Sequence, residues 1–188
     1  MTWEQINEMY EAGVSIGNHS ASHGHLAKKD VLEWKKEISL AQSRLYEKLG
    51  VTPTLFAYPY GEATNEMSSY LRTKGYIAAF GQHSGVASEW LDRYYLPRFS
   101  LNEKYGDIAR FSLAVNSLPM PAKEISPRNY VLTNNPPIFG FTVLSDSVNV
   151  DKIQCFASSQ DSPGEIQILN KKRIEVRFKK PFDSSRGR

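Results

Sequence analysis

Residues 17–26 read Gly-Asn-His-Ser-Ala-Ser-His-Gly-His-Leu, and this stretch decides how the rest of the chain is interpreted. It follows residues 14–17, a short run that is typical of a strand. Behind it, Asp30 and Glu33 form a capping-box pattern that opens a long helix, and Gly50 closes that helix. Parallel α/β folds place their active sites where a strand runs into the next helix. A polar segment at such a junction is therefore a candidate site.

Two imidazoles in this segment have a spacing that suits a metal ion. His19 and His23 are four residues apart, so both reach one ion if the chain turns helically after the strand. Neutral histidine nitrogen is a good ligand for zinc and related metals. Ser20 and Ser22 could cap the turn or orient the two ligands by hydrogen bonds. On spacing alone, surface or capping positions for the pair stay open, and His25 is expected to be a surface residue.

A second polar cluster ends the next predicted strand. Residues 56–61 read Phe-Ala-Tyr-Pro-Tyr-Gly. Pro59 and Gly61 would fix a tight loop and expose the backbone N–H of Tyr60 to a ligand. A backbone donor at that point is what an oxyanion hole requires. The alternative is an ordinary turn that ends a strand.

Helical and strand-like segments alternate in the first half of the chain. Thr2 and Gln5 form a capping box at the start of the first helix, which Gly13 ends. We expect further helices at 31–49, about 65–74 and about 107–115, and strands at 14–17, 55–58, 76–80 and, less regularly, 94–99. This order is the pattern of parallel βα units.

The character of the sequence changes at the proline-rich residues 118–121. Beyond them it predicts only short strands, at 138–143, 153–157, 165–169 and 174–178, with a turn at 161–164. We therefore expect an α/β domain over residues 1 to about 120. A small antiparallel β unit should follow over residues 130–188.

Composition and charge exclude several classes of protein. With 40% hydrophobic and 23% charged residues, the chain has a globular composition and not that of a disordered protein. A net charge of +3 is too small to indicate nucleic-acid binding. Basic residues outnumber acidic ones at residues 171–188, which predicts a solvated strand face or tail, with a contact to an acidic polymer as the alternative. No apolar run is long enough to cross a bilayer, and no signal peptide is visible. Cys155, the single cysteine, excludes an internal disulfide and a multi-cysteine zinc site.

Taken together, the two polar clusters resemble the polysaccharide deacetylase family, the carbohydrate esterases with a NodB-type homology domain. The family's metal motif has the form His-[Ser/Thr]-x-x-His, preceded by Gly-Asn and followed by Leu, and residues 17–26 match it. Residues 56–61 resemble the family's groove-wall motif, which ends in Pro-Tyr-Gly. The resemblance covers roughly residues 1–115. It implies a partial or distorted (β/α) barrel, α/β in class, followed by the antiparallel β unit.

The resemblance also implies a reaction, the metal-dependent hydrolysis of N-acetyl groups on a polysaccharide. His19 and His23 would be ligands of a divalent metal, with zinc as the expected ion. The metal would act as a Lewis acid and generate the nucleophile from water. The Tyr60 N–H would face the oxyanion, and Pro59, Tyr60 and Gly61 would line the substrate groove.

Other catalytic assignments rest on looser patterns. Ala57 occupies the place where many members of the family carry an arginine that orients the base. Arg98 resembles an arginine that one bacterial subgroup carries at this later point and could replace it in space, with a surface ion pair as the alternative. The family's general-acid motif is not recognisable, and His83, on a loop after a strand, could fill that role.

The sequence departs from the family at its carboxylates. The family's first motif, a strand ending in Asp-Asp, should lie well upstream of His19, whereas only 18 residues precede that histidine here. We expect a chain shortened at its N-terminus relative to the family. Asp30, Glu62, Asp92 or Asp107 could replace the base and the third ligand only by an unusual arrangement. A barrel without its first strand would leave sheet edges unpaired, so self-association is expected.

Two alternatives to a deacetylase remain open. A non-catalytic remnant would keep the histidine pair and bind glycans without hydrolysis, and a binding module would use residues 130–188 with the α/β segment as scaffold. Trp90, Tyr94 and Tyr95 could stack on sugar rings beside the site or could pack in the core. The family works outside the cytoplasm, so the resemblance implies a periplasmic, envelope or secreted location and an N-acetylated glycan as partner.

Overall fold

The computed structural model describes residues 1–158 and 160–182 of the 188-residue chain. The chain divides into two compact units, Met1–Leu118 and Pro119–Arg188. The first unit combines helices with parallel strands, and the second is an antiparallel sheet, so the predicted mixed α/β class is confirmed. Among the described residues, no helix combines the length and the hydropathy that a membrane crossing requires.

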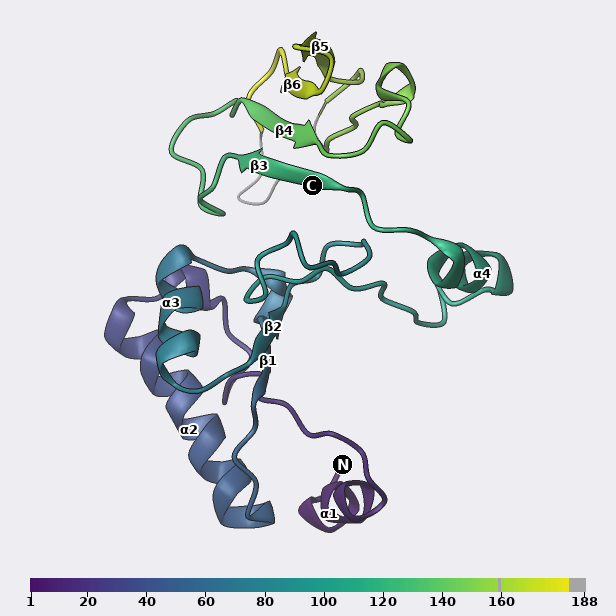
Figure 1. The fold of residues 1–188 in the computed structure, drawn as a ribbon. Coiled ribbons are helices and arrows are strands. Elements are labelled where there is room, and N and C mark those ends of the chain that lie inside the picture. The colour runs from purple at the N-terminus through teal and green to yellow at the C-terminus, as the bar shows by residue number, and fades with distance from the viewer. Residues whose placement is uncertain (159, 183–188) are drawn as a thin grey trace. The chain divides into compact units, whose positions relative to one another are not determined.

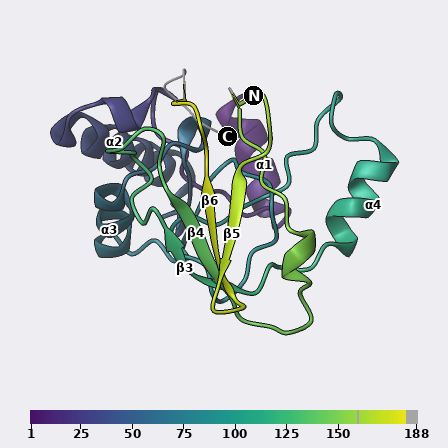
Figure 2. The ribbon, with the colours of Figure 1, turned by 90° about the horizontal axis from the view of Figure 1, so that it is seen from above.

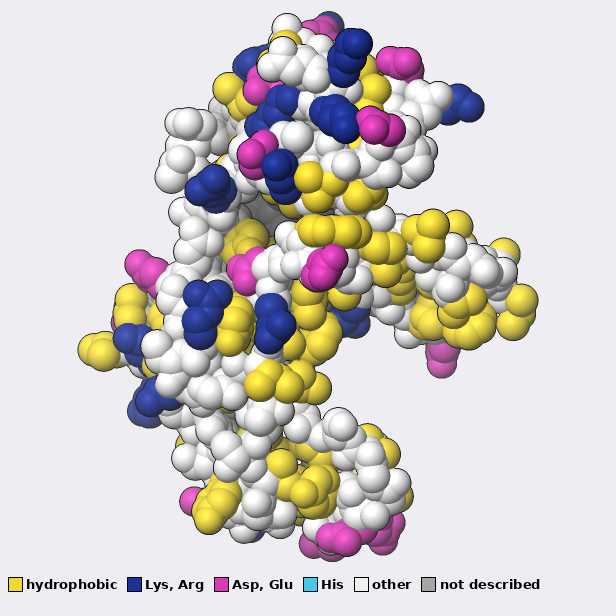
Figure 3. Space-filling view, viewed as in Figure 1, with side chains coloured by type: hydrophobic (Ala, Val, Ile, Leu, Met, Phe, Trp, Pro, Cys, Tyr) yellow, Lys and Arg dark blue, Asp and Glu magenta, His cyan; other side chains and the backbone are white. Residues whose placement is uncertain are grey.

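The first helix, α1, spans Trp3–Glu11 and begins as the sequence predicts. The Thr2 hydroxyl accepts a hydrogen bond from the Gln5 N–H, and the Gln5 side chain accepts one from the Thr2 N–H, so both halves of the capping box form. Gly13 follows the helix end at φ 89°, a left-handed conformation that glycine adopts without strain. Neither α1 nor α4 (Ile108–Asn116) buries a residue, and Figure 3 shows hydrophobic side chains gathered over α4.

Helix α2 spans Val31–Leu49 and supplies a helical packing surface of the first unit. Asp30 caps it by accepting a hydrogen bond from the Glu33 N–H, and Gly50 ends it at φ 67°. The stripe of side chains that it buries consists of Trp34, Ile38 and Ala41. This stripe is narrower than the periodicity predicts, because Val31 is exposed and Leu45 and Leu49 are only half-buried.

Two short parallel strands form the centre of the first unit. Strand β1 (Leu55–Ala57) pairs with β2 (Ala78–Phe80), and isolated bridges extend this pair on both sides, at Asn18 beside β1 and at Leu96 beside β2. The prediction of a strand at 14–17 is wrong. The backbone of that exposed segment hydrogen-bonds to β1 only from Asn18 onward, so no ladder forms earlier.

Helices α2 and α3 (Asn65–Thr73) lie on the same side of these strands (Figure 1). They contact each other where the Trp34 and Tyr70 rings meet edge to face, with centroids 5.2 Å apart. The Ser39 and Tyr70 hydroxyls share a hydrogen bond of 3.0 Å beside that contact. The core between helices and strands is closed by Leu26, Phe56, Tyr58, Met67, Leu71, Tyr76 and Ala79.

Asn18 is the polar residue that joins these layers. It is 1% exposed, and its amide nitrogen donates to the Ile38 carbonyl of α2 at 3.0 Å and to the Tyr76 hydroxyl at 2.8 Å. Its backbone pairs with β1 through the Leu55 carbonyl and the Ala57 N–H. Burial raises the pKa of Tyr76 to about 12, against the lowering effect of the Asn18 hydrogen bond, so Tyr76 stays a neutral hydroxyl.

The second unit is a four-stranded antiparallel sheet, with its strands side by side in the order β3, β4, β6, β5 (Figure 2). Its strands are β3 (Ala122–Ser126), β4 (Phe139–Val143), β5 (Glu165–Leu169) and β6 (Arg173–Arg177). Three of them lie close to the predicted ranges. Strand β3 was not predicted, since Ala-Lys-Glu-Ile-Ser lacks a strict hydrophobic alternation and is mostly exposed.

The core of the second unit lies on one face of this sheet and consists of Val143, Ile174, Val176, Phe178 and Phe182. The strand predicted at 153–157 is absent. Residues Ile153, Cys155 and Ala157 pack against the core in an irregular chain that follows a short 3-10 turn, Val150–Lys152. Their alternation therefore reflects burial of every second side chain without a pairing partner.

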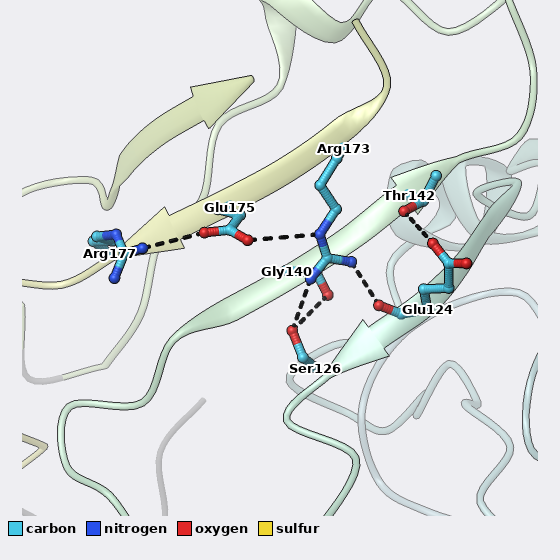
Figure 4. Close-up of polar contacts among 7 residues, drawn as sticks. All are labelled: Glu124, Ser126, Gly140, Thr142, Arg173, Glu175 and Arg177. Carbon is cyan, nitrogen blue, oxygen red and sulfur yellow. Dashed lines mark hydrogen bonds and ion pairs between the residues drawn. The ribbon is translucent and has the colours of Figure 1, made fainter. Parts of the chain in front are cut away.

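The opposite face of the sheet carries a polar network around Arg173 (Figure 4). Its guanidinium donates to the Glu124 carbonyl at 2.7 Å and to the Ser126 hydroxyl at 3.1 Å, and it lies 3.8 Å from the Glu175 carboxylate. Gly140 leaves the space for it, since a Cβ there would lie 2.4 Å from the guanidinium. Figure 3 shows basic and acidic side chains intermixed over this unit. Residues 183–188 of the basic run lie outside the described residues.

We predict that Asn18→Ala lowers the free energy of unfolding of the first unit by about 2–4 kcal/mol, because it leaves the buried Tyr76 hydroxyl short of a partner. Urea unfolding followed by tryptophan fluorescence measures this unit alone, since all three tryptophans (Trp3, Trp34 and Trp90) lie in it. The matched control is Asn116→Ala, at an exposed asparagine, with an expected change of about 0.5 kcal/mol or less. Equal effects of the two substitutions would contradict the role of Asn18.

Candidate active site

The histidine segment is held in a turn by its own polar side chains. The Ser20 N–H donates to the Asn18 side-chain oxygen at 2.9 Å, and the Ser20 hydroxyl accepts from the His23 N–H at 3.1 Å. Ser20 and His23 have φ values of 65° and 55°, in a region that side-chain-bearing residues rarely adopt. The segment is thus a left-handed turn and not the helical turn that the spacing suggested, and Ser20 caps it.

The carboxylate of Glu37, on α2, holds the same segment from behind. It accepts hydrogen bonds from the Ser22 N–H at 2.9 Å and from the Ser22 hydroxyl at 2.8 Å. Desolvation, the largest effect, raises the pKa of the Glu37 carboxyl, but the two Ser22 hydrogen bonds together with Lys29 and the Ala21 backbone lower it below its ordinary value. Glu37 therefore stays ionised and keeps the turn docked on α2.

The turn places the two predicted metal ligands side by side in solvent contact. The rings of His19 and His23 meet at 73° with centroids 4.7 Å apart, and both residues are exposed. His19 Nδ1 lies 2.6 Å from the Ala57 carbonyl oxygen. Because a carbonyl oxygen only accepts, Nδ1 carries the proton and the lone pair of His19 is on Nε2, the tautomer that a metal-binding histidine needs.

This arrangement fits a zinc ion at two of its coordination positions. Two imidazoles that share an ion at Zn–N distances of about 2 Å have ring centroids about 5 Å apart, close to the observed separation of His19 and His23. Over residues 1–158 and 160–182, no three His, Cys, Asp or Glu side chains gather closely enough to hold a metal ion. The pair alone is therefore the candidate metal centre of the described chain.

The second predicted cluster lies directly beside the first. Pro59–Gly61 form a single 3-10 turn after β1, in which Tyr60 has φ 56° and ψ 5°. The ring of Tyr60 meets the ring of His23 at 69°, with centroids 4.7 Å apart. A left-handed conformation costs a tyrosine about 1–2 kcal/mol, and such strain concentrates at functional sites.

Gly61 allows this turn to approach the loop after β2. It has φ 69°, and a Cβ on it would lie 2.5 Å from both the backbone nitrogen and the Cβ of Gln82. Tyr95 closes the contact, since its hydroxyl donates to the Gly61 carbonyl at 2.9 Å. The turn of residues 59–61, here called the rim, is therefore fixed by the backbone of Gln82 on one side and by the histidine turn on the other.

His25 contributes to the site, although the sequence placed it on the surface. Its ring stacks on the ring of Tyr60 at an angle of 8° with centroids 4.0 Å apart. Its Nδ1 donates to the Glu62 carboxylate at 2.9 Å. His25 remains partly exposed, with 45% of its side chain accessible, so it covers one face of Tyr60 without being buried.

His83 and Arg98 lie in the loops behind the rim. The His83 ring packs against Tyr95 with centroids 4.7 Å apart, and partial desolvation lowers the pKa of this histidine. Arg98 donates from Nε to the Gly81 carbonyl at 3.0 Å and from a terminal nitrogen to the Ser100 hydroxyl at 3.0 Å. These contacts hold both residues near the loop that meets Gly61, not against the histidine pair.

The remaining predicted residues are mostly engaged elsewhere. Tyr94 donates to the Tyr76 carbonyl at 2.8 Å and carries the Arg72 guanidinium over its ring, whereas Trp90 is exposed. The acidic residues named as possible substitutes have other partners: Asp30 and Asp107 cap helices, Asp92 accepts from the Tyr94 N–H, and Glu62 binds His25.

Sequence reasoning missed three groups that hold the site together. These are the Ala57 carbonyl behind His19, the Glu37 carboxylate behind Ser22, and the His25–Glu62 pair beside Tyr60. Only the last had a usable signal, since His25 lies within the same polar segment and Glu62 directly follows the Pro-Tyr-Gly turn.

The first 79 residues match the family model described as polysaccharide deacetylase. The peptidoglycan-N-acetylmuramic acid deacetylase PdaC of Bacillus subtilis (strain 168) is 35% identical over 69 residues, which cover 37% of this chain and 15% of PdaC. The matched family segment includes the histidine pair, the Tyr60 turn and both residues of the His25–Glu62 pair, and it ends before His83 and Arg98.

Solved structures show a similar fold. The deacetylase PplD of Streptococcus pyogenes, in complex with acetate, matches with a TM-score of 0.57 at 19% identity, over 62% of this chain and 51% of that chain. A polysaccharide deacetylase from Bacillus cereus matches with a TM-score of 0.52 at 20% identity, over 61% of this chain and 36% of that chain. The chain spans less than two thirds of each of these proteins. Residues 1–79 of this chain are therefore similar to the polysaccharide deacetylase family.

Proposed function

We propose that this protein removes N-acetyl groups from an N-acetylated polysaccharide. The reaction is metal-dependent hydrolysis of a non-peptide carbon–nitrogen bond. The observation that carries the proposal is the exposed His19–His23 pair, with centroids 4.7 Å apart, beside a tyrosine in strained left-handed conformation. The match of residues 1–79 to the polysaccharide deacetylase family model and the name of PdaC support deacetylation as the reaction and a glycan as the substrate class.

His19 and His23 would hold a divalent cation, with zinc favoured by their nitrogen ligands. When bound, the ion supplies Lewis-acid activation of the acyl group and of water. The Ala57 carbonyl fixes the tautomer of His19, and the turn from Ser20 to His23 fixes the second ring. Both contacts preorganise the pair, so ligand binding requires little rearrangement.

The rim supplies the groups that would meet the substrate. Tyr60 directs its backbone N–H from a turn that Pro59 and Gly61 constrain on both sides, and a fixed N–H donor stabilises negative charge as it develops on an acyl oxygen. The partly exposed ring of Tyr60, which contacts His23, would contact the sugar, as aromatic faces commonly do. Pro59, Tyr60 and Gly61 are the proposed substrate-binding residues.

His83 is the proposed proton donor to the leaving amine, and Arg98 the proposed support of a catalytic base. Desolvation lowers the pKa of His83, so its protonated form, which donates the proton, is favoured at lower pH than in an ordinary histidine. Arg98 has two of its donors on Gly81 and Ser100, so it can turn only part of its guanidinium toward another group.

We also propose a location and self-association for this protein. PdaC is named as a peptidoglycan deacetylase, and that name supports a proposed location of this protein at the cell envelope or outside the cell. Self-association is proposed through the short parallel sheet, because its outer neighbours at Asn18 and Leu96 pair by single bridges only.

We predict that zinc binds the full chain and that His19→Ala and His23→Ala each weaken zinc binding by more than about tenfold. Loss of a residue that only hydrogen-bonds to a metal ligand already lowers metal affinity by about 10- to 100-fold, so loss of the ligand itself should have at least that effect. Isothermal titration calorimetry with zinc alone measures this. His83→Gln is the matched control, because it removes a histidine outside the pair. Undiminished zinc binding in both alanine variants would exclude the pair as the metal centre.

We predict acetate release from oligomers of N-acetylglucosamine by the zinc-loaded chain, with loss of release after chelation and in the His19→Ala/His23→Ala double variant. Enzymatic quantification of free acetate gives the readout, and affinity electrophoresis on the same glycan measures binding separately. The wild-type chain could bind the glycan and yet release no more acetate than the double variant. That result would contradict the deacetylase proposal and support a non-catalytic glycan-binding protein.

We predict that His83 makes the first unit less stable on the acid side. Burial lowers the pKa of His83 in the folded chain below the ordinary value of 6.5, so the unfolded chain takes up its proton first as pH falls. Stability is therefore lost as pH falls below about 6.5, and His83→Gln removes this loss. Urea unfolding at about pH 7.5 and about pH 5.5 measures the difference between wild type and variant, and a difference that is independent of pH would contradict the assignment.

A further inference from the structure

One imidazole lies at the site but outside the candidate metal centre. His25 belongs to the same turn segment as His19 and His23, yet its two contacts point elsewhere, with its ring face on Tyr60 and its Nδ1 on Glu62. Among the described residues, His25 and Glu62 join no cluster with the metal-ligand side chains. The position of His25 is therefore explained by its contacts with Tyr60 and Glu62.

His25 contacts both ends of the turn that carries Tyr60. Its ring lies flat on Tyr60, at 8° and 4.0 Å, while its nitrogen donates to Glu62 two residues further along the chain, at 2.9 and 3.1 Å from the two carboxylate oxygens. Glu62 is well buried for a carboxylate, with 17% of its side chain accessible. One side chain thus closes a ring of contacts that runs from Tyr60 through Glu62 and back to Tyr60.

The backbone of Tyr60 needs such a restraint. At φ 56° and ψ 5° it occupies a conformation that a bulky residue leaves unless its surroundings hold it. Gly61 and Tyr95 restrain the far side of the turn, and the edge of the His23 ring touches Tyr60 on the near side. His25 supplies the stacked contact, in which its ring lies nearly parallel to that of Tyr60.

We propose that His25, anchored by Glu62, is a positioning residue that holds Tyr60 in its left-handed conformation and so fixes the direction of the Tyr60 N–H. The same stack joins the histidine turn to the rim, because Tyr60 lies between the rings of His23 and His25. The consequence for rate rests on the proposed deacetylase function, whereas the consequence for the conformation of Tyr60 does not.

Four variants of the full chain separate the two contacts. His25→Ala removes the stack and the hydrogen bond, His25→Phe keeps a flat ring on Tyr60, Glu62→Ala removes the anchor, and the double variant combines the two alanines. Glu89→Gln, at an exposed glutamate, is the control for handling and charge. The readouts are kcat and KM for acetate release and the amide resonance of Tyr60 in two-dimensional NMR, which suits a chain of 21.3 kDa.

We expect His25→Ala to lower kcat by about 10- to 100-fold with KM changed by less than about threefold, because a misdirected donor loses transition-state contact more than substrate binding. His25→Phe should recover most of this loss. Glu62→Ala should lower kcat less, and its effect should vanish in the His25→Ala background, since Glu62 acts through His25. The Tyr60 amide should shift in His25→Ala and stay in place in Glu89→Gln.

Two outcomes would overturn the proposal. One is a kcat and a Tyr60 resonance in His25→Ala that equal those of Glu89→Gln. The other is a loss of kcat that His25→Phe fails to recover while its Tyr60 resonance stays at the wild-type position. If the wild-type chain releases no acetate, the proposed function fails, and the NMR comparison alone decides whether His25 holds Tyr60.

Discussion

Asn18 carries its amide into the core between α2 and the sheet, where an unpaired polar group would be strongly destabilising. Its nitrogen is used by Ile38 and Tyr76, its side-chain oxygen by Ser20, and its backbone by β1. One residue therefore ties helix, strand and histidine turn together. Because these partners come from different elements, the position of the histidine pair is coupled to the packing of α2 against β1.

Local chemistry predicted the elements whose ends are set by neighbouring residues. Thr2 and Asp30 cap the helices that they were expected to open, since a cap depends on atoms within three or four positions. Strands depend on distant partners, and the errors are there. Residues 14–17 and 153–157 have suitable side chains but no paired backbone, whereas β3 pairs with β4 despite a poor pattern.

The candidate site divides in the same way. That His19 and His23 lie side by side was predictable, because their spacing in the chain is that of a candidate pair of metal ligands. The groups that orient them were not, because a backbone carbonyl such as that of Ala57 has no signature in the sequence, and Glu37 reaches Ser22 only after α2 has packed. His25 lay inside the recognised segment, but its partner Glu62 is 37 residues away.

Strain explains why so many contacts converge on so small a region. Three residues of the site, Ser20, His23 and Tyr60, adopt positive φ without being glycine, and each is disfavoured in isolation. Each also has a side-chain contact that compensates: Asn18 for Ser20, the Ser20 hydroxyl for His23, and His25 for Tyr60. A chain selected only for stability would replace these residues by glycine or asparagine. The strained conformations of His23 and Tyr60 are understandable if an imidazole and a directed N–H are needed at those two positions, because glycine provides neither the ring nor the restraint.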